Sequence, residues 1–325
     1  MDHYSLQNLQ YLAMNLRQLR TFVAIADAGG LARAEDRLQL SQPAACRQVQ
    51  ALETELGVPL FNRMGRRMQL TSEGEDLLRL SRRLLQDADS IGERARALKG
   101  GQTGILRVGA TPQTIESTLA VFLTAYRRRH PGVEVHLVED GTVRLPDRLN
   151  HGDVHLAMIA YDDRFHCRTL YPACALAVLS KNHPFGRRRT LDVAELADEP
   201  LLLLHTNFGS RAWFDAACHV AHIRPRVLLE SAAPQTIIAL AQEGHGVAVI
   251  PSTALVPRDG VHAAPLVQRG AAIGRWLTTA WDPQRFLAPY AKQFIEELVA
   301  HTRRDYPGRE LIRRAPPPPR PEAAR

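Results

Sequence analysis

The 325-residue sequence lacks long hydrophobic runs and is poor in cysteine. Its longest apolar runs, such as residues 201–204, are far shorter than the roughly 20 residues that a membrane helix needs. The four cysteines form no CxxC pair and no zinc-type cluster with histidine, so we expect reduced, mostly buried thiols, no metal and no cofactor. The first 13 residues lack the basic start and apolar block of a secretory signal. These absences predict a cytoplasmic protein.

Catalytic motifs are absent as well. The 13 histidines are scattered, and the sequence contains no Ser-x-x-Lys, Gly-x-Ser-x-Gly or His-Glu-x-x-His spacing, so we expect no enzymatic activity. The net charge is +7, but the excess is concentrated at the C-terminus: +2 over residues 1–100, +1 over 101–300 and +4 over 301–325. Global charge is therefore weak evidence for nucleic-acid binding, and that prediction depends on local patterns.

Three composition breaks divide the chain. Residues 16–98 are helical in pattern nearly throughout, apart from a break at 58–71, and a polar, glycine-rich joint follows at 99–104. The second break lies around residues 161–165. The third begins a basic, proline-rich tail, 303–325, which we expect to be disordered because a proline run cannot form a core.

From residue 104 onward, short apolar runs alternate with helical stretches. The runs with strand character are 105–109, 133–138, 154–159, 175–180, 200–204, 227–229, 247–250 and 274–281. The expected helices lie at about 117–130, 211–222, 235–243 and 286–301. Such alternation is typical of βαβ units and a mainly parallel sheet. We expect two α/β lobes: lobe I at about 105–160 and 269–302, and lobe II at about 161–268.

The segment 16–52 has the pattern of a helix-turn-helix. Apolar residues at helical spacing predict a first helix that ends at Gly29-Gly30, and a short second helix spans 31–38. Ser41 is expected to cap a third helix, with Pro43 in the first turn, where a missing N–H costs nothing. Two short helices joined by a tight turn can place the second helix in the major groove of DNA.

The third helix is polar on the face that a groove-reading helix presents. Gln42, Arg47 and Gln50 project from it, and glutamine and arginine can each form two hydrogen bonds to a base edge. Residues 62–71 then predict a β-hairpin with a Gly-Arg-Arg tip, whose cations suit phosphates or the narrow minor groove. For each feature alone, the alternatives are a solvated helix face and an ordinary exposed turn.

Several short blocks, in order and at the right spacing, resemble the LysR-type transcriptional regulators of bacteria. They are LRQLRTFVAIA at 16–26, SQPA at 41–44, RQV at 47–49, LE at 52–53, ELG at 55–57, LF at 60–61, LT at 70–71 and Gly74. Looser likenesses reach residue 302, including GHGVAVIP at 244–251. Because the likeness begins at Leu16, Met14 is a candidate translation start.

The resemblance implies an α+β multidomain fold. Its expected parts are an N-terminal extension at 1–13, a winged helix-turn-helix domain at 14–72, a dimerising linker helix at 73–99, a hinge at 100–104, an effector domain at 105–302 and the tail at 303–325. The effector domain is expected to resemble periplasmic binding proteins, with a ligand in the cleft between two lobes.

The resemblance also implies roles for single residues in DNA binding. The side chains expected near bases are Gln42, Pro43, Ala44 and Arg47. Those expected near phosphates are Ser41, Arg63 and Thr71. Arg66 is expected at the minor groove, and Arg67 is the other cation of the hairpin tip. Three positions depart from the family pattern: Gly30 and Cys46, where serine is usual, and Glu35, where a small alanine is usual.

The segment 72–98 carries a seam with four-three spacing, which is typical of a coiled coil. The seam consists of Leu77, Ser81, Leu84, Ala88, Ile91, Ala95 and Leu98. Because about three heptads are short, packing against the chain's own domains is the alternative. The resemblance implies an antiparallel linker-helix dimer, often assembled into a tetramer, and a dimer suits DNA with two half-sites.

Polar residues follow three predicted strands, where open α/β sheets bind ligands. The residues expected to line the effector cleft are Thr111, Gln113, Thr114, His205, Thr206, Asn207, Gln235 and Thr236, with Thr142 added by the resemblance. Hydroxyls, amides and free helix N–H groups suit a small anion such as a carboxylate. Simple helix capping is the alternative for each residue.

The sequence thus predicts a homodimeric or homotetrameric regulator that binds double-stranded promoter or operator DNA and responds to a small-molecule effector. RNA polymerase is a further candidate partner, and no membrane contact is expected. One alternative is a solute-binding protein, which the second half alone would permit but the helix-turn-helix pattern disfavours. The other is an enzyme on a two-lobed scaffold, which the missing catalytic groups disfavour. The effector, the target genes and the sign of regulation stay open.

Overall fold

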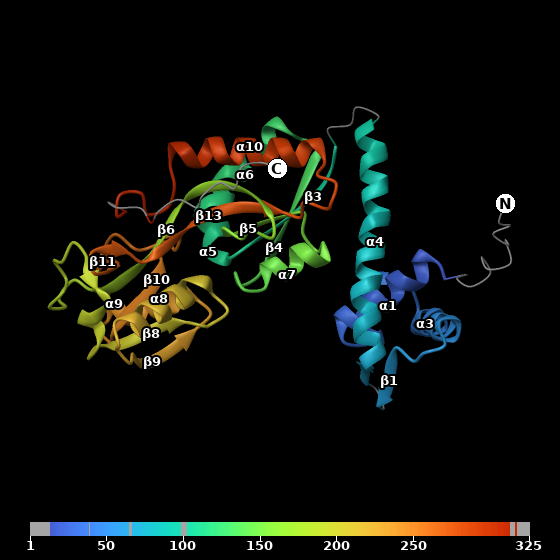
Figure 1. The fold of residues 1–325 in the computed structure, drawn as a ribbon, viewed down its shortest axis with the longest axis horizontal. Coiled ribbons are helices and arrows are strands. Elements are labelled where there is room, and N and C mark those ends of the chain that lie inside the picture. Colours follow the sequence, from blue (N-terminus) through green and yellow to red (C-terminus); the bar gives the residue numbers. More distant parts are fainter. Residues whose placement is uncertain (1–13, 39, 65–66, 99–102, 313–315, 317–325) are drawn as a thin grey trace, which may run out of the picture. The chain divides into compact units, whose positions relative to one another are not determined.

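A computed structural model describes residues 14–38, 40–64, 67–98, 103–312 and 316 (Figure 1). The chain falls into two compact units, residues 1–95 and 96–325, each with its own hydrophobic core. Within the described residues, no helix combines the length and the apolar character needed to cross a bilayer.

Three helices form the base of the N-terminal unit: α1 (Leu16–Ala28), α2 (Leu31–Leu38) and α3 (Gln42–Leu56). They enclose Phe22 and Leu52, both fully buried, as the helical spacing of apolar residues predicts. Helix α1 begins with a capping box between Asn15 and Gln18, and it ends at Gly29, whose positive φ of 65° suits glycine. The expected positions of all three helices are confirmed within about one residue.

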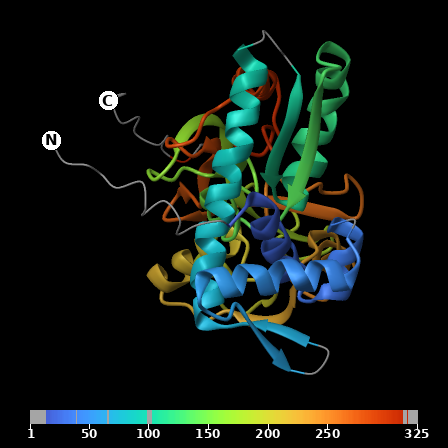
Figure 2. The same cartoon turned by 90° about the vertical axis from the view of Figure 1, so that its right-hand side faces the viewer.

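A hairpin and a long helix complete the unit. Strands β1 (Phe61–Met64) and β2 (Arg67–Leu70) pair antiparallel, and helix α4 (Ser72–Leu98) follows at once. Figure 2 shows the hairpin projecting beyond the helices. The carboxylate of Glu53 accepts hydrogen bonds from the backbone N–H groups of Leu60 (2.8 Å) and Phe61 (3.1 Å), so α3 fixes the start of the hairpin.

The junction between the hairpin and α4 leaves no room at Gly74. A Cβ atom there would lie 2.2 Å from the carbonyl oxygen of Leu60 and 3.1 Å from the hydroxyl of Thr71. That hydroxyl accepts from the N–H of Gly74 (2.9 Å) and donates to the carbonyl of Pro59 (2.7 Å). The first turn of α4 is thereby fastened to the segment that leads into the hairpin.

The chain of the C-terminal unit forms one mixed sheet, with eleven strands among the described residues. They are β3 (Gly104–Ala110), β4 (Val133–Glu139), β5 (Leu156–Ala160), β6 (His166–Ser180), β7 (Leu191–Asp192), β8 (Pro200–Leu204), β9 (Arg226–Ser231), β10 (Val247–Pro251), β11 (Val261–Gln268), β12 (Ala271–Ala272) and β13 (Gly274–Trp281). The main path runs β4-β3-β5-β13-β6-β10-β8-β9. The expectation of a mainly parallel sheet is wrong at its centre, where β13 and β6 pair antiparallel with each other and with their outer neighbours.

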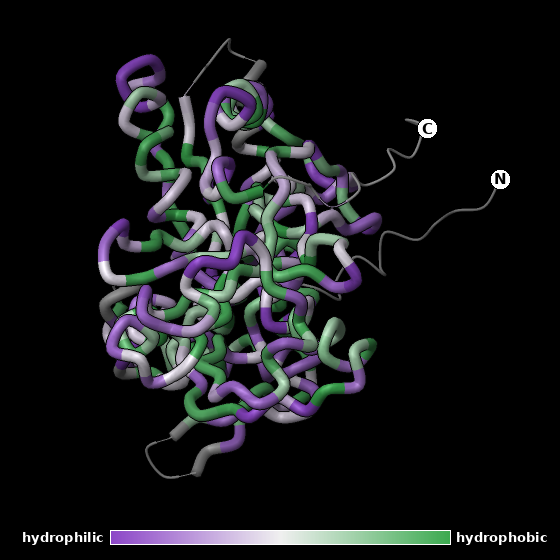
Figure 3. Tube along the Cα trace, turned by 90° about the vertical axis from the view of Figure 1, so that its left-hand side faces the viewer, coloured by the Kyte–Doolittle hydropathy of each residue, from purple (hydrophilic) through white to green (hydrophobic). Residues whose placement is uncertain are grey.

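Helices cover both faces of this sheet. They are α5 (Pro112–Thr114), a π-helical turn (Ile115–Leu119), α6 (Ala120–Arg129), α7 (Leu145–His151), a 3-10 turn (Val193–Leu196), α8 (Gly209–Val220), α9 (Pro234–Gln242) and α10 (Pro289–Arg304). Strand β8 is buried on both sides, with Leu201 packing on the α8 side and Leu202 on the α9 side. In Figure 3, hydrophobic segments run through the interior, and hydrophilic ones lie mostly in edge loops.

The chain crosses from one lobe to the other within a strand and returns at the start of another. The expected lobe boundaries are therefore corrected. The 15-residue β6 pairs with β13 in lobe I up to Cys174 and with β10 in lobe II from Ala175 onward. The returning crossover lies at Ile273-Gly274, where the N–H of Ala175 donates to the carbonyl of Ile273 (2.8 Å). The sequence places these switches near 160 and 268. Because β6 is continuous, no turn residue marks the change of lobe.

The tail is also ordered further than we expect from its composition. Helix α10 continues to Arg304, and residues 305–312 and 316 lie on the unit. Tyr306 packs on the core of lobe I and Leu311 on that of lobe II. These two apolar side chains anchor a segment that we expected to be disordered from its proline and arginine content.

One half-buried histidine in lobe I, His155, is expected to be neutral. The backbone N–H of Arg107 donates to Nδ1 of His155 (3.2 Å), and the Arg107 guanidinium lies 2.9 Å from Nε2. Burial, together with the charge of Arg107, lowers the pKa of His155 to about 3. Charging this ring therefore opposes folding.

We expect Gly74→Ala to destabilise the N-terminal unit by about 1–3 kcal/mol, because the new methyl group collides with backbone that cannot easily move. Urea unfolding of the full chain, followed by far-ultraviolet circular dichroism, measures the change. Asp87→Ala, at an exposed position of α4, is the control. Equal effects of the two substitutions would contradict the steric argument.

Acid should weaken the C-terminal unit through His155. Below about pH 6.5, His155 is protonated in the unfolded chain but stays neutral in the folded unit. As the pH falls, the free energy of unfolding therefore decreases by up to about 1.4 kcal/mol per pH unit for this group. His155→Gln should reduce the loss of stability between pH 7 and pH 5 in urea titrations. His136→Gln, at an exposed ring, should leave the loss as in the parent chain.

Candidate functional site

Helix α3 exposes the polar face that the sequence assigns to it. The exposed residues at its N-terminal half are Ser41, Gln42, Pro43 and Arg47, while Ala44 is half-buried. The opposite face, formed by Ala45, Val49 and Leu52, is buried in the core. A helix that is anchored on one face and polar on the other is what contact with base edges requires.

The scaffold beneath this face is fixed by Gln48. The hydroxyl of Thr21 in α1 donates to Oε1 of Gln48 (2.5 Å), so the oxygen of this amide links α3 to α1. An open hollow beside it is lined mainly by residues of α1 and α3, among them the cations Arg17 and Arg47. Sequence reasoning did not single out Arg17, whose place beside Arg47 depends on how the helices pack.

Two expectations at this site need correction. Ser41 stands at the N-cap position of α3, but its side chain forms no capping hydrogen bond to the described part of the helix; Pro43 also removes one N–H that a cap could bind. Thr71 is only 7% exposed, and its hydroxyl is engaged with Pro59 and Gly74. It therefore holds the hairpin to α4 and is not positioned for a phosphate.

The hairpin places its backbone as we expect, with Arg63 opposite Met68 and Met64 opposite Arg67. The side chains of Arg63 and Arg67 lie outside what the structure describes, as does the whole of Arg66. Their predicted contacts with phosphates and the minor groove therefore stay predictions.

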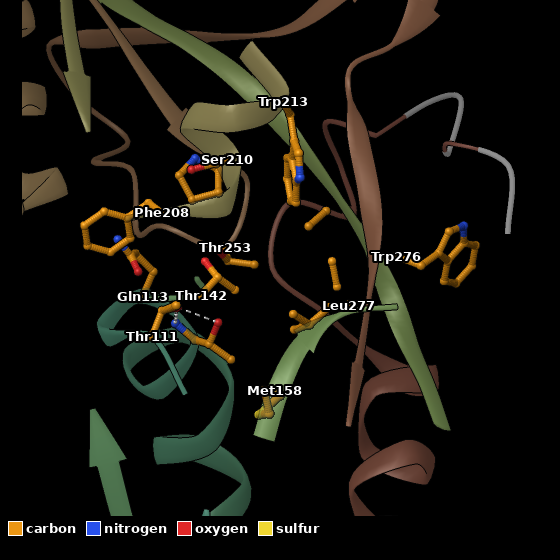
Figure 4. A pocket seen from close by; sticks show the side chains of 14 residues that line it. Thr111, Gln113, Thr142, Met158, Phe208, Ser210, Trp213, Thr253, Trp276 and Leu277 are labelled. Atoms are coloured by element: carbon orange, nitrogen blue, oxygen red, sulfur yellow. Dashed lines mark hydrogen bonds between the residues drawn. The ribbon is translucent and has the colours of Figure 1, made fainter. Parts of the chain in front are cut away.

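A pocket with an empty volume of about 460 Å³, including space open to solvent, lies between the lobes of the C-terminal unit (Figure 4). Lobe I contributes Thr111, Gln113, Thr114, Thr142, Met158, Ala160, Ala173, Trp276 and Leu277. Lobe II contributes Phe208, Ser210, Trp213, Pro251 and Thr253. None of these described lining residues is charged, and the lining combines apolar walls with neutral hydrogen-bonding groups.

The polar groups on the lobe I side of the pocket follow the ends of strands β3 and β4. The hydroxyls of Thr111 and Thr114 lie 3.0 Å apart, and Thr111 also accepts weakly from the N–H of Thr114 (3.4 Å). Gln113 is 1% exposed, and its side-chain nitrogen has no hydrogen-bond partner among the described residues. A buried hydrogen-bond donor without a partner destabilises the folded state. The side-chain nitrogen of Gln113 is therefore the atom of the pocket at which a ligand's acceptor would be most favourable.

The other sequence-predicted residues do not line the pocket. Three hydrogen bonds link the lobes, two of them through the loops that carry the lining residues Thr142 and Phe208. The N–H of Gly209 donates to the hydroxyl of Thr142 (2.8 Å), and the N–H of Val143 donates to the carbonyl of Asn207 (3.3 Å). Gln235 donates to the carboxylate of Glu116 (3.2 Å).

His205, Thr206 and Thr236 are exposed. Of the nine predicted residues, the structure thus gathers the four of lobe I in the pocket wall. The five of lobe II lie outside the lining.

Sequence reasoning missed the apolar wall. Phe208, Trp213, Met158 and Leu277 have the composition of ordinary core, and only the fold reveals that they face a hollow. In Figure 4, Trp213 and Thr253 point into the pocket from lobe II. No signal in the sequence separates such residues from their fully buried neighbours.

Two of the four thiols, those of Cys174 and Cys218, are buried. Burial raises the pKa of Cys174 to about 11 and that of Cys218 to about 12, so the reactive thiolate is disfavoured at both. Among the described residues, no group of three His, Cys, Asp or Glu side chains could hold a metal ion.

The geometry therefore defines the class of ligand-responsive DNA-binding regulators, in which a helix-turn-helix unit is joined to a two-lobed binding unit.

Comparison with known proteins agrees at the level of family. Residues 16–75 match the model of the bacterial regulatory helix-turn-helix proteins of the lysR family, and residues 99–303 match the LysR substrate binding domain. The chain therefore belongs to the LysR family of transcriptional regulators. Members of this family bind DNA and small-molecule effectors and oligomerise, and they are not enzymes.

Relatives and solved structures match over nearly their whole length. The chain is 33% identical to the HTH-type transcriptional regulator IlvR of Caulobacter vibrioides (78% of this chain, 88% of IlvR). It is 29% identical to the regulator YnfL of Escherichia coli (88% and 98%). A full-length OxyR variant of Pseudomonas aeruginosa is similar in structure, with a TM-score of 0.68, 26% identity and coverage of 90% and 95%. CbnR complexed with its target DNA has a TM-score of 0.62, 26% identity and coverage of 90% and 99%.

Thr142→Val should loosen the rim of the pocket, because valine keeps the shape of threonine but cannot accept from the N–H of Gly209. Losing one hydrogen bond of about 1 kcal/mol predicts roughly fivefold faster amide exchange at Gly209. Hydrogen exchange measured by mass spectrometry checks this. Thr124→Val, the same change on exposed α6, is the control; unchanged exchange at Gly209 would refute the bridging role.

Proposed function

We propose that the chain acts as a cytoplasmic homo-oligomer that reads promoter or operator DNA with the exposed face of α3 and responds to an effector bound between its lobes. The observation that carries the DNA-binding part is the exposed pair Gln42 and Arg47 on a helix whose other face is locked into the core. Gln42 and Arg47 can each form two hydrogen bonds to a base, while Pro43 and Ala44 bring apolar groups to the groove.

Phosphate contacts surround this reading face. Ser41 is exposed at the start of α3, where the helix N-terminus favours an anion. We propose that Arg63, Arg66 and Arg67 of the hairpin add backbone or minor-groove contacts. Thr71 is not part of this proposal, because its hydroxyl is used inside the unit.

The seam of α4 supports self-association. Leu84 and Ile91 are exposed, Ile91 to 72%, whereas Leu78 and Leu85 turn inward to the core of the unit. The start of the seam packs instead against the chain's own domain, since Ser81 is buried. An apolar stripe left uncovered from Leu84 to Ala95 suits a second copy of the same helix, in a dimer or a tetramer.

The pocket lining indicates the chemistry of the effector. Its walls suit a small, largely apolar molecule, and its hydroxyls and the Gln113 amide suit an oxygen acceptor such as a carboxylate. With no cation among the described lining residues, a carboxylate would depend on neutral donors. Effector binding would shift the relation between the lobes and so the spacing of two DNA-reading helices, which would in turn affect RNA polymerase at the promoter.

A gel-shift titration with the DNA upstream of the protein's own gene tests the proposal. We expect specific binding that weakens steeply as salt rises and that covers two half-sites about one helical turn or a multiple apart. A thermal-shift screen of small carboxylic acids, amino acids and aromatic compounds should then find an effector that changes the footprint. Purified protein that ignores duplex DNA at low salt would refute the proposal.

Arg47→Ala should reduce discrimination between the operator and unrelated DNA by about 1–3 kcal/mol, because a two-bond contact to guanine is lost. Competition binding at fixed salt measures the ratio of the two affinities. Arg83→Ala, which removes the same charge from exposed α4, is the matched control and should leave the ratio unchanged. Equal weakening of Arg47→Ala on both DNAs would make Arg47 a phosphate contact only.

A further inference from the structure

The segment after the last helix runs back across both lobes. The ring of Tyr306 stacks on that of Tyr171 in lobe I, with centroids 5.4 Å apart and planes 10° from parallel. Leu311 then packs on the apolar core of lobe II that contains Leu176 and Ile250. The two anchors are five residues apart in sequence, so a short stretch of chain joins one lobe to the other.

These contacts lie at the first crossover between the lobes. Tyr171 precedes the switch in β6 by only three residues. Cys174, at the switch, is clamped to Ser252 of lobe II: its N–H donates to the Ser252 hydroxyl (3.1 Å), and its carbonyl accepts from the Ser252 N–H (2.7 Å).

Gly308 lies over Ser252. A Cβ there would approach the Cβ of Ser252 to 2.7 Å, and the φ of Gly308 is +78°. Both the space and the conformation at this point of the tail require glycine.

The segment also reaches the second crossover. The indole Nε1 of Trp276 donates to the carbonyl of Pro316 (2.8 Å), and Pro316 is buried. Trp276 follows the switch at Gly274 by two residues, and its neighbour Leu277 faces the pocket. Figure 4 shows the ring of Trp276, itself a lining residue, pointing away from the other labelled side chains of the pocket, so the tail contacts β13 from that side.

We propose that residues 305–312, together with Pro316, form a strap, a third and releasable connection that holds the lobes at the angle seen here and thereby sets the opening of the effector pocket. The two covalent crossovers lie side by side, and a pair of adjacent strands can bend as a hinge. A contact that spans both lobes beside the hinge restrains that bending. The contacts of the strap with the lobes described here are all noncovalent, and Tyr306 and Leu311 are only half-buried. The strap can therefore open without unfolding either lobe.

Hydrogen exchange on the full-length protein tests the strap, and the test needs neither DNA nor effector. A chain ending at Arg304 should exchange the amides of Ala175 and Ser252 about tenfold faster, with little change at Leu106 and Leu202 in the lobe cores. A chain ending at Pro316, which keeps every strap contact described here, should exchange like the parent.

Trp276→Phe gives a milder test that keeps the ring. It removes the bond to Pro316 while keeping an aromatic ring, and it should raise exchange at the second crossover by about threefold. Unchanged exchange at both crossovers in the chain ending at Arg304 would overturn the proposal, as would an equal rise across both lobes, which would make the tail ordinary core. The strap rests on the proposed pocket for its regulatory meaning, but a failed gel shift would leave these exchange rates unaffected.

Discussion

One strand belongs to both lobes, and the C-terminal unit is organised around it. Strand β6 hydrogen-bonds to β13 on one side of its midpoint and to β10 beyond it. The returning chain must pass directly beside it: a Cβ at Gly274 would lie 2.2 Å from the carbonyl oxygen of Ala173, so only glycine fits. Two crossovers pressed together make a narrow hinge, and the pocket lies where the strands on either side of it end.

This arrangement explains why the pocket is lined from both lobes and why its rim contains bridging hydrogen bonds. Thr142 and Asn207 come from loops that follow strands of different lobes, and they meet only because β6 and β13 hold the two halves of the sheet together. A small change in the angle between the lobes would break these bonds while leaving each core intact. The bonds between Thr142 and Gly209 and between Val143 and Asn207 join neutral groups, so breaking them uncovers no buried charge.

Periodicity in the sequence was sufficient for the longer helices and most strands, because each buries a defined face, but it did not predict the short helix α7 or strand β11. The alternation of apolar and polar residues in α1 to α3 identified the helix-turn-helix, and the exposed face of α3 followed from it. The same reasoning failed at β6, where a continuous strand changes lobe without a turn, and at Thr71, which resembles a surface hydroxyl but is enclosed by Pro59 and Gly74. These features depend on contacts between distant segments.

The two functional surfaces differ in how far sequence can reveal them, and the difference is physical. A helix that reads DNA keeps polar side chains out of the core, so Gln42 and Arg47 stand out against an apolar background. A pocket for a small, largely apolar molecule is lined by the same residues that fill a core, and Trp213 or Met158 could occupy either. What distinguishes the pocket is a mismatch inside the core, such as the side-chain nitrogen of Gln113, buried without a partner among the described atoms. Such a mismatch emerges only when the atoms around it are placed.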